Sequence, residues 1–301
     1  MAARAGRIGL QNLPREIEQA ALQRGELPAR AQPAARKRRL HLVAGILLLC
    51  AAVTAALAAP LLTPYAPDAI NAGVRLSPPS AAHLFGTDAF GRDLFTRVVY
   101  GARLALKLSV LSVFISAVPG ILLGLAAGFY RGWVDQVVSR LIDAWLSLPG
   151  LLLALLVIAR TGPSLDGAIL ALGITGVPGF YRLVRSGTIS LCQLPYVEAA
   201  RSVGVPDGRL MLRHILPNLL SSIVVLTTMR LGTFLLAGGG LSFIGLGAQP
   251  PDPEWGAMLA EGRDYYSTAW WLFAFPAGAM ILTVMGFNLL GDGLRDQLAE
   301  Y

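Results

Sequence analysis

The sequence has 301 residues, of which 54% are hydrophobic and 14% are charged, and its mean hydropathy is +0.59. Soluble proteins carry about 25% charged residues, so this composition excludes an ordinary soluble domain and indicates an integral membrane protein. The formal net charge of +7 would also fit a nucleic-acid binder. However, almost all of the cations are arginines that cluster at the N-terminus and beside apolar runs, which is typical of membrane orientation. We therefore expect membrane lipid, and no nucleic acid, as a partner.

The first part of the chain, residues 1–40, is a basic tail that ends in Arg36-Lys37-Arg38-Arg39. It is too long for the charged region of a signal peptide. The stretch Ala58-Ala59-Pro60 after the first apolar run resembles a cleavage site, so a cleaved signal stays open as an alternative. The rule that positive segments stay inside predicts a cytoplasmic tail.

Six apolar runs are long enough to cross a hydrocarbon core of about 30 Å, which takes about 20 helical residues. No run shows the strict alternation over about ten residues that a barrel strand would need. The fold class is therefore predicted as all-α, with a membrane domain over 41–301. If the tail is cytoplasmic, both termini and the polar interval before the fifth run are cytoplasmic too. The predicted spans lie near 41–62, 104–129, 137–158, 167–184, 219–246 and 270–290.

Several residue types inside these runs are interpreted as packing elements. Gly124, Gly128 and the run Gly238–Gly240 lie within or at the ends of spans, where small residues let helices approach closely in lipid. We favour packing over flexibility for these glycines. Cys50 and Cys192 indicate neither a disulfide framework nor a metal site.

The polar interval 196–218 predicts a helix-turn-helix elbow. Tyr196 to Val203 suits a short helix, with the negative charge of Glu198 in its first turn and two alanines that let another surface approach. Gly204 is a residue that can end such a helix in the left-handed conformation. Val205 to Gly208 has turn chemistry and leads toward a second helix that starts near Arg209.

The order Glu198-Ala199-Ala200, Gly204 and Leu216-Pro217 resembles the EAA loop of ABC-importer permeases, although His214 stands where the generic pattern has Ile. In that family the loop is cytoplasmic, and its coupling helix sits in a groove on the ATPase subunit. The alternative is an ordinary polar loop between two membrane helices. The resemblance implies that the ATPase is contacted by Glu198, Ala199, Ala200, Arg201, Gly204, Val205, Asp207 and Arg209.

Three further blocks resemble the C-type permease of dipeptide, oligopeptide and nickel importers, so that the resemblance runs from about residue 40 to the C-terminus. The blocks are 85–103, 240–259 and 288–296. We expect the charged residues of the first block to form a network at the membrane surface. Trp255 in the second is expected at the membrane interface. The residues with an expected structural role are Gly86, Thr87, Asp88, Gly91, Arg92, Asp93, Pro253, Trp255 and Gly256.

Ionisable residues inside apolar runs are functional candidates by default. Asp143, in the third run, either faces a translocation path or is an interfacial charge that pairs with Arg140. Pro149-Gly150 in the same run can break the helix. The same ambiguity holds for Arg103, Lys107 and Arg230.

The chain lacks the phosphate-binding loop of P-loop ATPases, and its three histidines form no cluster with metal-ligand spacing. We therefore expect no enzyme activity, cofactor or metal in this chain. The resemblance implies a bacterial inner-membrane permease that forms half of a path for di- or oligopeptides. It further implies a second homologous permease, two subunits that bind ATP and Mg, and an extracytoplasmic solute-binding protein.

Two kinds of alternative stay open. With the same architecture, the solute would be nickel, glutathione or another small molecule. With a different class, the protein would be a secondary transporter, for which internal repeats and mid-membrane charges are expected, or a membrane anchor or sensor that transports nothing.

Overall fold

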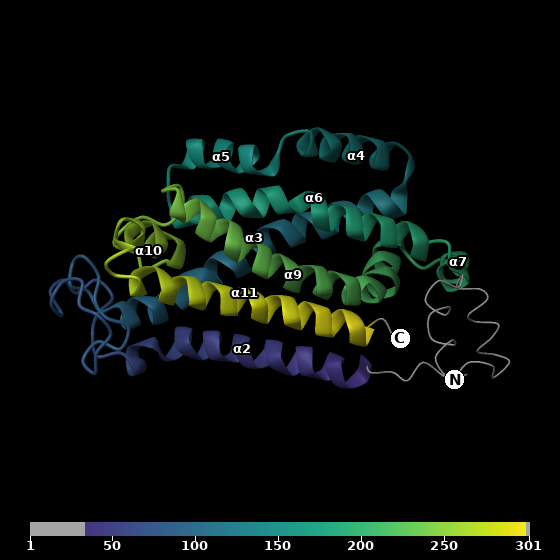
Figure 1. The fold of residues 1–301 in the computed structure, drawn as a ribbon. Coiled ribbons are helices and arrows are strands. Elements are labelled where there is room, and N and C mark those ends of the chain that lie inside the picture. Colours follow the sequence, from purple (N-terminus) through teal and green to yellow (C-terminus); the bar gives the residue numbers. More distant parts are fainter. Residues whose placement is uncertain (1–33, 299–301) are drawn as a thin grey trace, which may run out of the picture. The chain divides into compact units, whose positions relative to one another are not determined.

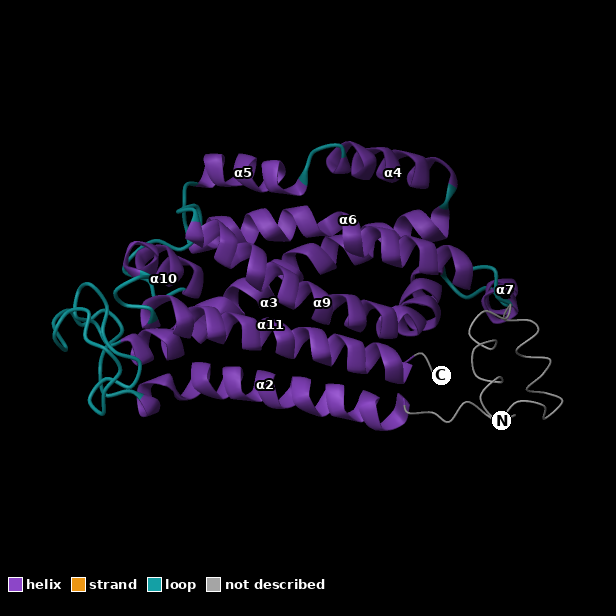
Figure 2. Ribbon diagram, in the orientation of Figure 1, coloured by secondary structure: helices purple, strands orange, loops and turns teal. Residues whose placement is uncertain are grey.

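The computed structural model describes residues 34–298, and most of the predicted basic tail lies outside this range. Residues from His41 onward form one compact unit. Over the described residues the chain consists of helices joined by loops, as Figure 2 shows. The extended pairing in this range is an isolated bridge between Thr87 and Asp93.

The helices follow one another as Figure 1 labels them. They are α2 (Ala34–Leu62), α3 (Leu94–Tyr130), α4 (Gly132–Leu146), α5 (Gly150–Thr161), α6 (Leu165–Leu191), α7 (Pro195–Ser202), α8 (Asp207–Arg209), a π-helical segment (Leu210–Ile215), α9 (Leu216–Phe243), α10 (Trp255–Gly262), a 3-10 turn (Arg263–Tyr265) and α11 (Trp271–Leu298).

Five helices within the described range are long and apolar enough to cross a membrane, and a sixth span results if α4 and α5 count as one. The run predicted as a span over 137–158 is broken into α4 and α5, which are bent by 86° relative to each other. The break lies at Pro149, whose backbone is extended with φ −54° and ψ 130°. Proline lacks the N–H for a helical hydrogen bond and keeps the preceding residue out of the helical region.

The second span begins ten residues before the predicted 104, because α3 starts at Leu94. Asp93 caps this helix: its Oδ2 accepts hydrogen bonds from Thr96 N at 2.8 Å and from Thr96 Oγ1 at 2.7 Å. A hydropathy window detects only the apolar part of a helix. The polar first turns of α3 were therefore not predicted as part of the span.

Helices α3 and α6 pack through three glycines of α3 spaced four residues apart. A Cβ added to Gly120, Gly124 or Gly128 would lie 2.6 to 2.9 Å from Cβ atoms of α6. Each glycine therefore brings the two backbones closer than any side chain would allow. The packing role predicted for Gly124 and Gly128 is confirmed, and Gly238 and Gly239 fit against Leu108 and Met280. The same prediction is wrong for Gly240, where a Cβ would meet no atom of the described residues within 4 Å.

The two ends of the helical bundle carry different structures. The loop between α6 and α9, with α7 in it, lies at one end, and α10 lies at the opposite end (Figure 1). The connection from α2 to α3, residues 63–93, is at the α10 end as well. We refer to these as the α7 end and the α10 end.

Candidate functional site

The α7 helix ends in a Schellman motif. Gly204 has φ +79°, and its N–H donates to the carbonyl of Arg201 at 3.0 Å. The N–H of Val205 donates to the carbonyl of Ala200 at 3.2 Å, and these two side chains join the same hydrophobic cluster. The predicted end of the first helix is confirmed. The second helix begins at Asp207, two residues before the predicted Arg209.

The inner side of the elbow is anchored to the membrane helices. Val197 of α7 is 1% exposed, and Leu210 and Ile215 of the π-helical segment are fully buried. Leu210 and Ile215 lie in one cluster with residues of α3, α6 and α9, namely Leu125, Phe129, Val184, Leu219 and Ile223. Apolar side chains from three membrane helices therefore hold the inner side of the elbow against the bundle.

Polar contacts add to this anchoring. Asn218 Nδ2 donates to the carbonyl of His214 at 2.6 Å and to Tyr196 Oη at 3.3 Å. The guanidinium of Arg201 lies 5.1 Å from the ring centre of Phe129, at the end of α3. Cation–π contacts at exposed sites contribute about 0.5–1 kcal/mol. Helix α7 is therefore tied both to α3 and to the start of α9.

The elbow continues into α9 without a gap. Between them, Leu210–Ile215 forms a π-helix, in which the N–H of Leu216 bonds to the carbonyl of Met211. In a regular α-helix Pro217 would collide with the carbonyl of Arg213 and leave it without a donor. A wider turn just before the proline relieves both problems, and sequence patterns alone did not predict it.

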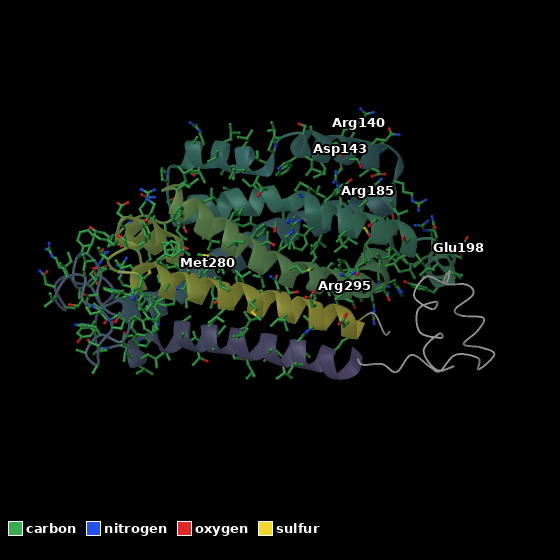
Figure 3. The ribbon with its side chains drawn as sticks, viewed as in Figure 1. Arg140, Asp143, Arg185, Glu198, Met280 and Arg295 are labelled. Carbon is green, nitrogen blue, oxygen red and sulfur yellow. The ribbon has the colours of Figure 1, made fainter. Side chains whose placement is uncertain are left out.

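The outer side of α7 is solvent-exposed in this chain. Ala199 and Glu198 face outward, and Val203, a large apolar residue, is 80% exposed. Figure 3 shows Glu198 at the α7 end. Of the eight residues predicted for ATPase contact, Ala200 and Val205 are half-buried because they pack inward, and Glu198, Ala199, Arg201, Gly204, Asp207 and Arg209 are exposed.

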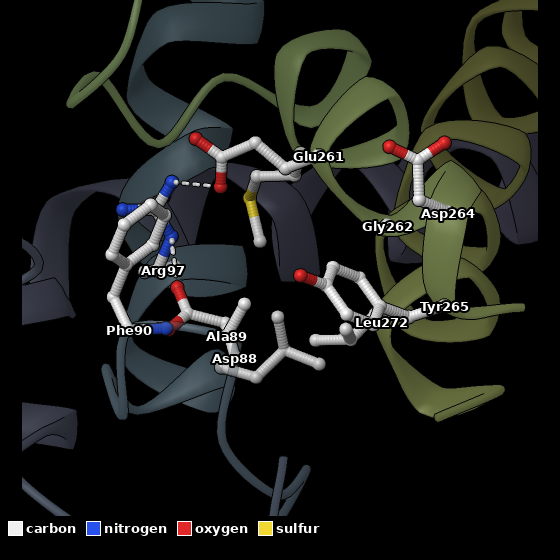
Figure 4. Close-up of a pocket in the computed structure, with 11 residues that line it drawn as sticks. Asp88, Ala89, Phe90, Arg97, Glu261, Gly262, Asp264, Tyr265 and Leu272 are labelled. Atoms are coloured by element: carbon white, nitrogen blue, oxygen red, sulfur yellow. Dashed lines mark hydrogen bonds and ion pairs between the residues drawn. The ribbon is translucent and has the colours of Figure 1, made fainter. Parts of the chain in front are cut away.

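At the α10 end, Asp88, Arg92 and Arg97 of the first block form a charge network together with Glu261, while Asp93, also expected in the network, is not part of it. Asp88 Oδ2 accepts from Arg92 Nε at 2.5 Å, and Glu261 Oε2 accepts from Arg92 Nη2 at 2.7 Å and from Arg97 Nη2 at 3.3 Å. Arg97 is 1% exposed and also donates to the carbonyls of Pro67 and Pro251. The network borders a pocket of about 240 Å³ (Figure 4). The network of charged side chains joins the α2–α3 connection and the start of α3 to α10.

The turns of the first block, residues 85–103, depend on two of its glycines and on Thr87. Gly86 and Gly91 have φ +79° and +72°, a region that side chains disfavour. Thr87 Oγ1 accepts a hydrogen bond from the N–H of Ser77 at 2.9 Å, and the carbonyl of Thr87 accepts one from Trp271 Nε1 at 3.2 Å. Asp93, besides capping α3, lies 2.8 Å from His83 Nδ1.

The second block packs against the first part of α3 and against α9. A Cβ on Gly256 would lie 2.1 Å from the carbonyl oxygen of Gly239, and a Cβ on Gly101 would lie 2.5 Å from that of Pro253. The expectation that Trp255 lies at the membrane interface is wrong. It is 2% exposed, and its Nε1 donates to the carbonyl of Val98 at 2.9 Å. Its indole fills a protein interior instead of meeting headgroups.

Glu254 is a buried acid beside this block. Its Oε2 accepts from Ala257 N at 2.9 Å and so caps α10. Burial raises the pKa of Glu254 above its usual value, while hydrogen bonds from Gly256, Ala257 and Ser242 act in the opposite direction. The sequence did not single out this residue, because glutamate is not among the residues preferred at helix N-caps.

Asp143 lies on α4 with an exposed carboxylate, 3.7 Å from Arg182 Nη2 of α6. The predicted pair with Arg140 is therefore replaced by a contact between two helices. Figure 3 shows the side chains of Arg140 and Asp143 on α4. A stronger tie between these helices joins Asp135 and Arg185 in a bidentate pair, with distances of 2.5 and 2.6 Å. These partners are 50 positions apart, a separation at which charge patterns do not identify pairs.

No group of three His, Cys, Asp or Glu side chains with metal-binding geometry occurs among the described residues. The site residues thus form two separate regions. The exposed elbow occupies the α7 end, and a buried network of polar and aromatic contacts occupies the α10 end.

The sequence of this chain is similar to those of known membrane transport proteins. Residues 120–300 match the family described as binding-protein-dependent transport system inner membrane component. A dipeptide transport system permease protein of Alkalihalophilus pseudofirmus is 46% identical over 263 residues, 87% of this chain and 86% of that protein. A glutathione transport system permease protein of Escherichia coli O157:H7 is 49% identical over 220 residues, 73% of each chain.

Among solved structures, an inward-facing structure of the MetNI methionine ABC transporter has a TM-score of 0.55 at 20% identity. The match covers 67% of this chain and 95% of that one. At this identity the likeness concerns the fold, and it confirms the predicted all-helical membrane fold.

Proposed function

The chain belongs to the family of binding-protein-dependent transport system inner membrane components, and we propose that it is a permease subunit of an ATP-driven importer of di- or oligopeptides. The solutes named for the two relatives, dipeptide and glutathione, are both short peptides. This supports a peptide more than nickel, which no relative described here is named for. Glutathione itself is the second candidate solute, because the relative named for it shares 49% of its residues with this chain over the matched region.

The proposed assembly contains this chain and a second, homologous permease, which together enclose the path. Two further subunits bind ATP and Mg and hydrolyse ATP, so that this chain itself contributes no catalytic group. A solute-binding protein delivers the peptide at the α10 end. In this arrangement the α7 end and both termini are cytoplasmic.

One observation carries the coupling role: α7 is anchored on its inner side and open on its outer side. Val203 exposes 80% of its surface, and the elbow also exposes Glu198, Asp207 and Arg209, which carry both signs of charge. Such a surface suits a protein partner with a small apolar groove. Because Phe129 and the π-helical segment hold α7 from behind, a displacement of α7 is passed to α3 and α9.

The ATP-binding subunits provide the free energy that separates the inward-open and outward-open states, and the elbow provides the mechanical link between them. A ligand or nucleotide shifts such an equilibrium only through a difference in affinity for the two states. We therefore assign Glu198, Ala199, Arg201, Gly204, Asp207 and Arg209 to the contact with the ATP-binding subunit. Ala200 and Val205 shape the elbow from inside.

The test uses Glu198→Lys and Gly204→Asp in the complex reconstituted with its ATP-binding subunits. Each variant is expected to reach the membrane in normal amounts and to lose the ATP hydrolysis that a loaded binding protein stimulates. Normal peptide uptake by a well-expressed variant would contradict the coupling role.

A matched pair separates backbone conformation from side-chain chemistry. A Cβ meets no atom within 4 Å at either Gly204 or Gly208, but only Gly204 has positive φ. Forcing an alanine into that region costs about 1–2 kcal/mol. Gly204→Ala is therefore expected to reduce coupling, while Gly208→Ala leaves it unchanged. Equal effects of the two substitutions would show that the elbow geometry is unimportant.

A further inference from the structure

The three cations Arg103, Lys107 and Arg230, within or beside predicted spans, have different surroundings. Arg103 of α3 donates from Nε to the carbonyl of Ala56, and Lys107 lies 3.0 Å from Asp166. Arg230 lies at the middle of α9, and the described residues give its guanidinium neither a hydrogen bond nor an ion pair. Such a residue at mid-membrane marks a functional site by default.

The guanidinium of Arg230 lies against the backbone of α6. A Cβ built on Gly179 would be 2.6 Å from Arg230 Nη2, so the absence of a side chain at Gly179 makes room for it. The arginine is half-buried at this crossing. Its position is thus set by α6, and its charge stays near the protein surface between the two helices.

The surface beside Arg230 differs from a surface made for lipid. On the side of α9 that the helical repeat shares with Arg230, up to ten positions away from it, the helix exposes Met229 and Leu236 together with small or polar residues, namely Ser222, Thr233, Ala237 and Gly240. Elsewhere the same helix exposes Leu220 and Val224, as expected toward hydrocarbon. On α6, the exposed or half-exposed positions include Thr175, Arg182 and Ser186.

A cavity opens one turn away from Arg230. Its volume is about 370 Å³, and Leu226 and Met229 of α9, Leu183 of α6 and Arg295 of α11 line it together with two serines. Figure 3 shows Arg295 near the C-terminal end of α11, toward the α7 end. The two arginines thus mark a route along α9 that leads from mid-membrane toward the α7 end.

We propose that Arg230 binds the carboxylate of the transported solute at mid-membrane, and so favours peptides with a free C-terminal carboxylate. This inference rests on the proposed function as a peptide importer. A guanidinium offers a planar pair of N–H donors that matches a carboxylate, and it stays charged when partly desolvated. The free carboxylate of a peptide is the group that would satisfy an otherwise unpartnered guanidinium here.

The experiment uses the whole complex in proteoliposomes, with trialanine and trialanine amide as probes. The affinity of the binding protein for each peptide is measured first, so that both are tested at saturation. Uptake and ATP hydrolysis are then compared for wild type, Arg230→Met, Arg230→Lys and a control, Arg160→Gln. The control removes a positive charge from the exposed last turn of α5, away from the α6–α9 surface.

In Arg230→Met, trialanine uptake is expected to fall about tenfold, while amide uptake and ATP hydrolysis change less than twofold. Arg230→Lys keeps part of the trialanine uptake, and Arg160→Gln keeps all of it. Unchanged trialanine uptake in Arg230→Met would overturn the inference and leave peptide import intact. An equal loss of both peptides and of assembled complex would also overturn it, and would indicate an ion pair with the second permease. Wild-type complex that takes up neither peptide would refute peptide import itself.

Discussion

The close crossing of α3 and α6 makes a quantitative prediction at Gly120. A Cβ at this position would lie 2.6 Å from Phe180 Cβ, 2.8 Å from the Val177 carbonyl oxygen and 3.1 Å from Tyr181 N. Carbon atoms in contact are about 3.5–4.0 Å apart, so Gly120→Ala forces the helices apart by roughly 1 Å. Two of the three atoms are backbone atoms, and a side-chain rotation cannot relieve the contact.

The expected cost follows from two opposing terms. Overpacking of this kind costs about 1–3 kcal/mol, whereas alanine gains about 1 kcal/mol over glycine in helix propensity. The net loss of stability is therefore about 0–2 kcal/mol, and the loss relative to a Gly-to-Ala change without overpacking is about 1–3 kcal/mol. The assay is thermal unfolding of the purified complex. The quantity measured is the fraction of the complex that stays monodisperse after heating.

Gly278→Ala in α11 is the matched control, because a Cβ there meets no atom within 4 Å of this chain. It should keep or raise the thermal stability through helix propensity alone. If Gly120→Ala is as stable as this control, α3 and α6 do not cross as closely as the structure indicates.

Two further predictions concern the α10 end. Arg97→Met leaves the charges of Asp88 and Glu261 less compensated in a buried network, so the free energy of unfolding is expected to fall by about 3–5 kcal/mol. The double variant with Glu261→Gln should recover part of the thermal stability. No recovery would argue against the ion pair of Arg97 with Glu261. The raised pKa of Glu254 adds stability that is complete below its unfolded pKa and is lost as pH rises through the folded value. Glu254→Gln, which keeps a cap acceptor, should therefore gain thermal stability relative to wild type as pH rises, and a difference independent of pH would refute this.

Local signals explain what could be predicted about the elbow. Gly204 ends α7 because a left-handed residue is needed there, and the requirement involves only the four residues before it and one after it. The break at Pro149 is equally local, since proline alone removes the hydrogen bond. Features that depend on a single turn of chain can be read from residue types.

Long-range contacts explain what could not be predicted. Glu261 lies 169 positions from Arg92 in the sequence and yet completes its ion pair. Trp255 was expected at the membrane interface, but the fold encloses it against Val98. One of the two interpretations of Asp143 paired it with Arg140, one turn away, whereas its carboxylate contacts Arg182 of another helix. Each of these outcomes depends on how helices cross, which hydropathy and charge patterns do not specify.

The central claim is that the exposed side of α7 contacts an ATP-binding subunit, and site-specific cross-linking tests it most directly. Cys50 and Cys192 are first replaced by alanine, and a single cysteine is placed at Val203, which is 80% exposed, or at Val74, which is 77% exposed at the α10 end. A maleimide that carries a benzophenone is then attached to this cysteine in membranes that contain the whole complex, and irradiation lets the benzophenone insert into a C–H bond of whichever chain lies next to it. We expect Val203→Cys, and not Val74→Cys, to cross-link to the ATP-binding subunit. Absence of this product from Val203→Cys in assembled complex, or equal products from both positions, would contradict the account.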